Sequence, residues 1–152
     1  MTAITEIDAM LQTADLEGAG TAQLVYLGIA GREFVLDTAD PADQDTGRGV
    51  TRHFLLGEKS NVVNPDDNDP RRPQLDTDDL DRYPVYIRIN PDYSDPQAGW
   101  IVERVNVTVN PDAQVTHYFD QPRLINTAED RRIKLGGRMG TVVYLKRNDD
   151  DV

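Results

Sequence analysis

Residues 104–109 alternate strictly between polar and apolar side chains, and shorter runs of the same kind recur along the chain. In an extended backbone Val105, Val107 and Val109 point to one side, and the polar residues between them point to the other. This two-residue period is typical of a β-strand with one buried face. Because no window of useful length keeps the period of a helix, the sequence predicts an all-β protein.

Further candidate strands are separated by clusters of Gly, Pro, Asn and Asp, which are the residues that turns favour. The complete set of candidate strands spans residues 7–11, 23–29, 33–37, 53–56, 85–89, 101–109, 115–119, 132–135 and 141–146. Gly136-Gly137, between the last two strands, fits a hairpin turn. Short strands with one polar face predict an antiparallel β-sandwich of about eight strands.

The chain has 152 residues and no cysteine, so its apolar core must hold it together without disulfides. We expect a single domain over residues 1–152, with an acidic tail at 148–152. Two connections, 38–52 and 57–82, are long and show no periodic pattern. Loops of this length in a compact domain are usually functional or ordered by a partner.

The net charge is −11, and the acidic residues are 21 Asp against 6 Glu. Such a surface repels nucleic acids and anionic membranes at long range, so neither is an expected partner. The bias toward Asp fits a high-salt habitat, and it fits equally a coding bias combined with Asp-rich turns. Both interpretations stay open.

Several segments, in the same order along the chain, resemble the PLAT (lipoxygenase-homology) domain family. The first turn, Thr13–Thr21, contains Thr-x-Asp and ends in Gly-Ala-Gly-Thr, and it leads into Val25-Tyr26-Leu27. The later matches are Gly31–Asp37, His53–Gly57, Ile87–Asp92 and the strand Gly99–Val107 with its tryptophan. The resemblance covers about Ile4 to Val109 and fades beyond it.

This resemblance implies a PLAT-like antiparallel sandwich of eight strands with a non-catalytic role in docking an enzyme, another protein or a membrane. It also implies a calcium site, because the loops that carry Asp15, Glu17, Asp92 and Asp95 meet at one end of the family's sandwich. Calcium prefers such carboxylate oxygens on flexible loops. The family usually has Asp directly after Gly-Thr, where this chain has Ala22. The alternative is that these acidic residues only form turns.

The sequence offers no catalytic motif. His53 and His117 are the only histidines, and each lies in a strand-like run without a nucleophile motif beside it. We therefore predict that the protein is not an enzyme. Trp100 begins a strand with an apolar face, which predicts that it belongs to the core rather than to a membrane-inserting loop.

Three functional hypotheses follow. The first is a recognition module that binds a protein partner through its long acidic loops. The second is a self-assembling structural subunit of a virion or a secreted particle, and the third is a calcium-dependent lipid-binding domain. No signal peptide or transmembrane segment is evident, so the expected location is the cytoplasm by default, or a particle or an export route of another kind.

Overall fold

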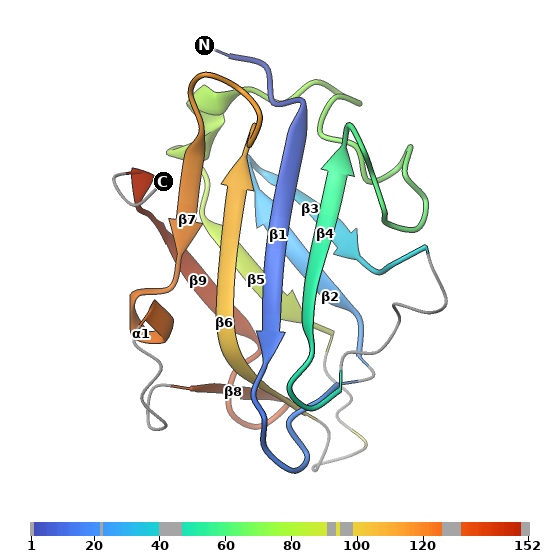
Figure 1. The fold of residues 1–152 in the computed structure, drawn as a ribbon, viewed down its shortest axis with the longest axis vertical. Helices are drawn as coiled ribbons and strands as arrows, with labels where there is room; N and C mark the ends of the chain where they lie inside the picture. The colour runs from blue at the N-terminus through green and yellow to red at the C-terminus, as the bar shows by residue number, and fades with distance from the viewer. Residues whose placement is uncertain are drawn as a thin grey trace.

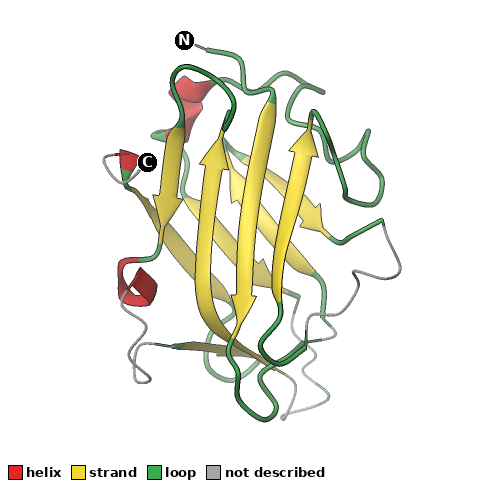
Figure 2. Cartoon of the chain, in the orientation of Figure 1, coloured by secondary structure: helices red, strands yellow, loops and turns green. Residues whose placement is uncertain are grey.

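The computed structural model describes residues 2–21, 23–39, 47–90, 94, 99–125 and 132–149. Within these residues it is a sandwich of two antiparallel sheets, as predicted, with nine strands and short helical turns (Figures 1 and 2). The strands are β1 (Glu6–Thr13), β2 (Val25–Ile29), β3 (Arg32–Leu36), β4 (Thr51–Gly57), β5 (Val85–Ile89), β6 (Gly99–Val109), β7 (His117–Asp120), β8 (Ile133–Gly136) and β9 (Val142–Arg147). The short helices are the 3-10 turn η2 (Thr77–Leu80) and α1 (Pro122–Ile125).

The front sheet in Figure 1 has the order β7-β6-β1-β4, and β8 pairs with the start of β6. The back sheet has the order β9-β5-β2-β3. Strand β9 joins the two sheets, because Val142–Leu145 pairs with β5 whereas Lys146 and Arg147 pair with β7. The continuous strand path ends at β3 and at β4, and β8 lies outside this path.

The alternating residues of the strands fill the space between the sheets. Val105, Val107 and Val109 are at most 1% exposed, which confirms the inward face predicted for this strand. Trp100 is 2% exposed, and its indole N–H donates a hydrogen bond of 2.8 Å to the hydroxyl of Thr13 on β1. The prediction that this tryptophan belongs to the core is confirmed.

The predicted hairpin after β8 is wrong in its pairing, although the turn itself forms. Gly136 and Gly140 make an isolated bridge around residues 137–139. Strand β8 then pairs with β6 in the front sheet, whereas β9 crosses to β5 in the back sheet. The turn residues could be recognised locally, but the partner of each strand depends on long-range packing.

The long connection from β4 to β5 is ordered by its own bonds to the sandwich. Asn61 acts as a strand partner at the β4 edge, because its side-chain oxygen accepts from the Leu55 N–H at 2.8 Å and its amide donates to the His53 carbonyl at 2.9 Å. At the other edge the side-chain oxygen of Asn68 accepts from the Val35 N–H at 2.9 Å. One loop thus covers part of both sheet edges.

The same connection is fastened to β3 by Arg32. Its guanidinium donates to the carbonyl oxygens of Asp67, Asp69 and Arg72 at 2.6 to 2.9 Å. The carboxylate of Asp69 is buried and accepts two hydrogen bonds from the guanidinium of Arg71, which lowers its pKa. These polar side chains stabilise the loop itself, which gives a structural reason for residues that the sequence only marked as an acidic loop.

Candidate functional site

Two of the four predicted calcium ligands belong to the described residues. Asp15 and Glu17 lie in the turn after β1, whereas Asp92 and Asp95 lie outside the described residues. The Asp15 carboxylate pairs with the guanidinium of Arg48 at 2.8 Å, and both side chains are exposed. Among the described residues no group of three or more His, Asp or Glu gathers closely enough to hold a metal. The calcium site therefore remains a prediction.

The two histidines lie on the outermost strands of the front sheet, His53 on β4 and His117 on β7, with β1 and β6 between them. His53 contacts the Asp8 carboxylate through Nδ1 at 3.0 Å, and His117 contacts Asp149 through Nδ1 at 3.0 Å. Each histidine thus has its own local acidic partner, and the two do not form a pair.

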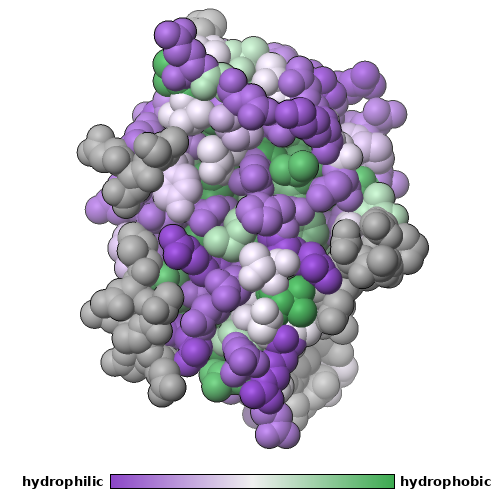
Figure 3. Space-filling model, in the orientation of Figure 1, coloured by the Kyte–Doolittle hydropathy of each residue, from purple (hydrophilic) through white to green (hydrophobic). Residues whose placement is uncertain are grey.

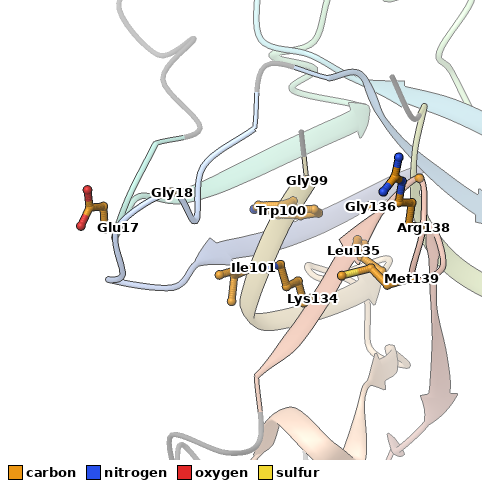
Figure 4. Close-up of a pocket in the computed structure, with 11 residues that line it drawn as sticks. Glu17, Gly18, Gly99, Trp100, Ile101, Lys134, Leu135, Gly136, Arg138 and Met139 are labelled. Carbon is orange, nitrogen blue, oxygen red and sulfur yellow. The ribbon is translucent and has the colours of Figure 1, made fainter. Parts of the chain in front are cut away.

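A pocket of about 320 Å³ lies at one end of the front sheet, and we call it the Trp100 pocket. Its lining residues come from the turn after β1, the start of β6, strand β8 and the turn before β9: Glu17, Gly18, Gly99, Trp100, Ile101, Lys134, Leu135, Gly136, Gly137, Arg138 and Met139 (Figure 4). The walls are fixed by backbone contacts. The Ile101 N–H donates to the Ala19 carbonyl at 2.9 Å, and a Cβ at Gly99 would lie 2.5 Å from the Leu135 carbonyl oxygen. Only glycine permits so close an approach of β8 to β6.

The outer faces of the two sheets differ in chemistry. Figure 3 shows the front face as mainly hydrophilic, with hydrophobic residues scattered in small patches. The back sheet instead carries Tyr26, Glu33, Tyr86, Arg88 and Tyr144 on its outer side, and we call this set the tyrosine face. Strand register places the set together, because Tyr86 lies between Gly28 and Tyr144, and Arg88 lies beside Tyr26.

Gly28 lets the ring of Tyr86 lie flat across β2. A Cβ at this glycine would be 2.1 Å from Cζ of Tyr86, so any side chain here would occupy the place of the ring. The Tyr86 hydroxyl crosses the glycine and donates to a carboxylate oxygen of Glu33 on β3 at 2.6 Å. A glycine inside a strand is therefore required by a close approach rather than by a turn.

Arg88 holds the same carboxylate from a second direction. Its guanidinium donates through Nε and Nη2 to the two oxygens of Glu33 at 2.6 and 2.8 Å, which is a bidentate pair. The guanidinium carbon lies 4.0 Å from the centroid of the Tyr26 ring, within cation–π distance. The Arg88 hydrogen bonds, followed by that of Tyr86, lower the pKa of Glu33 to about 2 against the opposing effect of burial.

Tyr144, a member of the tyrosine face, and the neighbouring Tyr83 are the most exposed rings of this surface. Tyr144 packs edge-to-face on Tyr86 with ring centroids 6.1 Å apart and is 61% exposed. Tyr83, just before β5, is 49% exposed and lies with Tyr86 around a hollow of about 200 Å³ beside the β2–β3 turn. The tyrosine face thus presents aromatic rings to solvent, and the charge of its one carboxylate, Glu33, is balanced by Arg88.

The tyrosine face could not be predicted from the sequence. The alternation in β5 places Tyr86 and Arg88 on one side of a strand, but the strands that flank it cannot be read from that pattern. Gly28 within a β-prone run was the available signal, since glycine inside a strand indicates close approach of another group.

The sequence matches no family model. It is 26% identical over 136 residues to the human lipoxygenase homology domain-containing protein 1, and the alignment covers 84% of this chain and 6% of that protein. The chain therefore spans only a small part of that relative.

Solved structures show the same fold. An alpha toxin from Clostridium absonum has a TM-score of 0.55 and 24% identity over 95% of this chain and 32% of its own. The alpha-toxin of Clostridium perfringens, from an avian strain, also has a TM-score of 0.55, with 19% identity, covering 95% of this chain and 31% of its own. A lipoxygenase variant in complex with arachidonate has a TM-score of 0.53 and 13% identity over 94% of this chain and 16% of its own. Together with the lipoxygenase-homology relative, these likenesses support a PLAT-like domain.

Proposed function

We propose that this protein is a non-catalytic recognition module of the PLAT family that binds a protein partner through its tyrosine face. The similarity to a lipoxygenase-homology protein supports the family, and the two histidines with separate local partners support a role without catalysis. The observation that carries the choice of surface is the ordered network of Tyr86, Arg88 and Glu33 beneath exposed tyrosine rings.

Tyrosine and arginine are enriched at the energetically dominant positions of protein interfaces, where rigid side chains contribute area at little entropic cost. On the tyrosine face the positions of Tyr86 and Arg88 are fixed before any partner arrives, which reduces the ordering cost of binding. Glu33, the acidic member of this face, forms an ion pair with Arg88, so a partner need not desolvate a free carboxylate there.

The surface differs from the one that the sequence suggested. The long connection between β4 and β5 uses Asn61, Asn68 and Arg32 to bind the chain to itself, so its order needs no partner. The rest of the hypothesis, a protein partner, is kept.

A photo-crosslinking amino acid at position 144 tests this proposal in the native host. We expect one discrete crosslinked protein from position 144, and none from position 12 on the outer side of β1, which serves as the matched control. Equal crosslinking at both positions, or none at position 144, would contradict the proposed surface.

The self-assembling subunit and the calcium-dependent lipid binder give different results in solution. Gel filtration with light scattering should find a monomer of 17.0 kDa for the recognition module, and a stable particle many times larger for a structural subunit. Liposome flotation that depends on calcium would favour the lipid binder. No helix within the described ranges is long and apolar enough to cross a bilayer.

A further inference from the structure

The Trp100 pocket contains two cations that have no partner. Eight of the 16 basic side chains form ion pairs with carboxylates among the described residues. These paired residues are Arg48, Lys59, Arg71, Arg72, Arg82, Arg88, Arg132 and Arg147. The side chains of Lys134 and Arg138, in contrast, make no hydrogen bond or ion pair with any part of the chain that the structure describes, and both residues line the pocket. Arg104 and Lys146 make no such contact among the described residues either, but neither lines the pocket.

Apart from Glu17, the other residues that line the pocket are apolar or glycine. Trp100 and Leu135 are buried, and the Met139 side chain beside them is 55% exposed. Figure 4 shows Leu135 and Met139 side by side next to Trp100, with Arg138 near them and Glu17 at the far side, directed away from the pocket. Gly136 and Gly137 leave the rim open. An apolar floor with a few charged groups is the usual design of a small-molecule site.

We propose that the Trp100 pocket binds a carboxylate attached to a small apolar group. Arg138 and Lys134 supply charge-assisted hydrogen bonds, and an arginine guanidinium matches the two oxygens of a carboxylate. The apolar lining makes a carboxylate with an apolar group a better match for the pocket than inorganic phosphate, which has no apolar part. Leu135, Met139 and the edge of Trp100 contact the apolar part of the ligand.

Trp100 is the only tryptophan, so its fluorescence reports this pocket alone. The probe is N-acetyl-leucine, and its uncharged amide is the matched control ligand. We expect a saturable fluorescence change with the acid below about 20 mM, the range expected for a site with few contacts. We expect none with the amide over the same range.

Variants of the intact chain separate local contacts from the general field. Arg138→Gln and Lys134→Gln should each weaken binding of the acid about tenfold or more. Lys146→Gln makes the same change in net charge on β9, away from the pocket, and should leave affinity within about twofold because screening attenuates distant exposed charges. Glu17→Gln should leave affinity nearly unchanged, because the Glu17 carboxylate is directed away from the pocket. Circular dichroism confirms that each variant folds.

A peptide ending in leucine, compared as free acid and as C-terminal amide, distinguishes the two sources of this chemistry. Tighter binding of the peptide acid than of N-acetyl-leucine would identify a polypeptide C terminus, and tighter binding of N-acetyl-leucine a free organic acid; both outcomes support the carboxylate site. The proposal is overturned if the amide binds as well as the acid, if inorganic phosphate competes as strongly as the acid, if no saturable change appears, or if Lys146→Gln weakens binding as much as Arg138→Gln. The crosslink from the tyrosine face does not depend on any of these results, because that face belongs to the other sheet.

Discussion

Replacing Gly28 by alanine tests whether the tyrosine face has the ordered structure described above. The new Cβ would lie 2.1 and 2.2 Å from two atoms of the Tyr86 ring, far inside van der Waals contact. The ring must therefore leave β2, and its hydroxyl must release the Glu33 carboxylate, with which it now forms a hydrogen bond of 2.6 Å.

The expected cost combines overpacking with the loss of a hydrogen bond. Overpacking costs roughly 1–3 kcal/mol in a tight core, and a surface ring that can swing into water lies near the lower end. The hydrogen bond to a charged acceptor adds about 1 kcal/mol after allowance for exposure. We expect Gly28→Ala to lower the free energy of unfolding by about 2 kcal/mol and Tm by roughly 4–8 °C for a domain of this size.

A double-mutant cycle with Tyr86→Ala isolates the cause. Once the ring is absent, alanine at position 28 meets no obstacle and reduces the entropy of the unfolded strand, so it should be neutral or stabilising by roughly 0.5 kcal/mol. The sign of the Gly28→Ala effect should thus reverse between the two backgrounds in urea unfolding followed by Trp100 fluorescence. If Gly28→Ala costs the same with and without the Tyr86 ring, then the ring does not lie on the glycine.

Three other predictions use urea unfolding followed by circular dichroism, because Trp100→Ala removes the only tryptophan. The pKa of Glu33 is lowered from 4.5 to about 2, so its ion pair stabilises the fold above pH 4.5, and this contribution is lost as pH falls toward 2. Glu33→Gln should therefore lower the free energy of unfolding by about 1 kcal/mol at pH 7, after discounting for exposure, and by progressively less below pH 4.5; a cost that does not change with pH would refute the pairing. Trp100→Ala should cost roughly 3–5 kcal/mol because a fully buried indole and its bond to Thr13 are lost, and a variant that melts within a few degrees of wild type would contradict this. If Asp15, Glu17, Asp92 and Asp95 bind calcium, calcium at about 100 times its Kd should stabilise the fold by about 2.7 kcal/mol, more than magnesium does, and Asp15→Asn should abolish the difference between the two ions. We expect the opposite result, equal stabilisation by both ions through charge screening, because Asp15 pairs with Arg48 and Ala22 stands where the PLAT family usually has Asp.

The fold could be predicted because its main signal is local. In β6 the alternation of Val105, Val107 and Val109 with polar residues specifies which side is buried, whatever strands lie beside it. The hairpin predicted after β8 failed for the opposite reason, since pairing between strands is decided by packing of the whole sandwich. The same limit hid the tyrosine face, in which Glu33 and Arg88 are 55 residues apart in sequence.

The tyrosine face is connected to the loop that covers the β3 and β4 edges of the sandwich. A partner that adds a strand needs a free edge, and Asn61 and Asn68 already occupy hydrogen-bonding groups of β4 and β3. Strand β3 links this edge cover to the tyrosine face through consecutive residues: Arg32 binds the loop carbonyls, Glu33 joins Arg88 and Tyr86, and Phe34 enters the core. The loop that covers the edge therefore also anchors the strand that carries the carboxylate. The covered edges disfavour strand addition, and this supports the proposal that a partner binds the outer side of the back sheet.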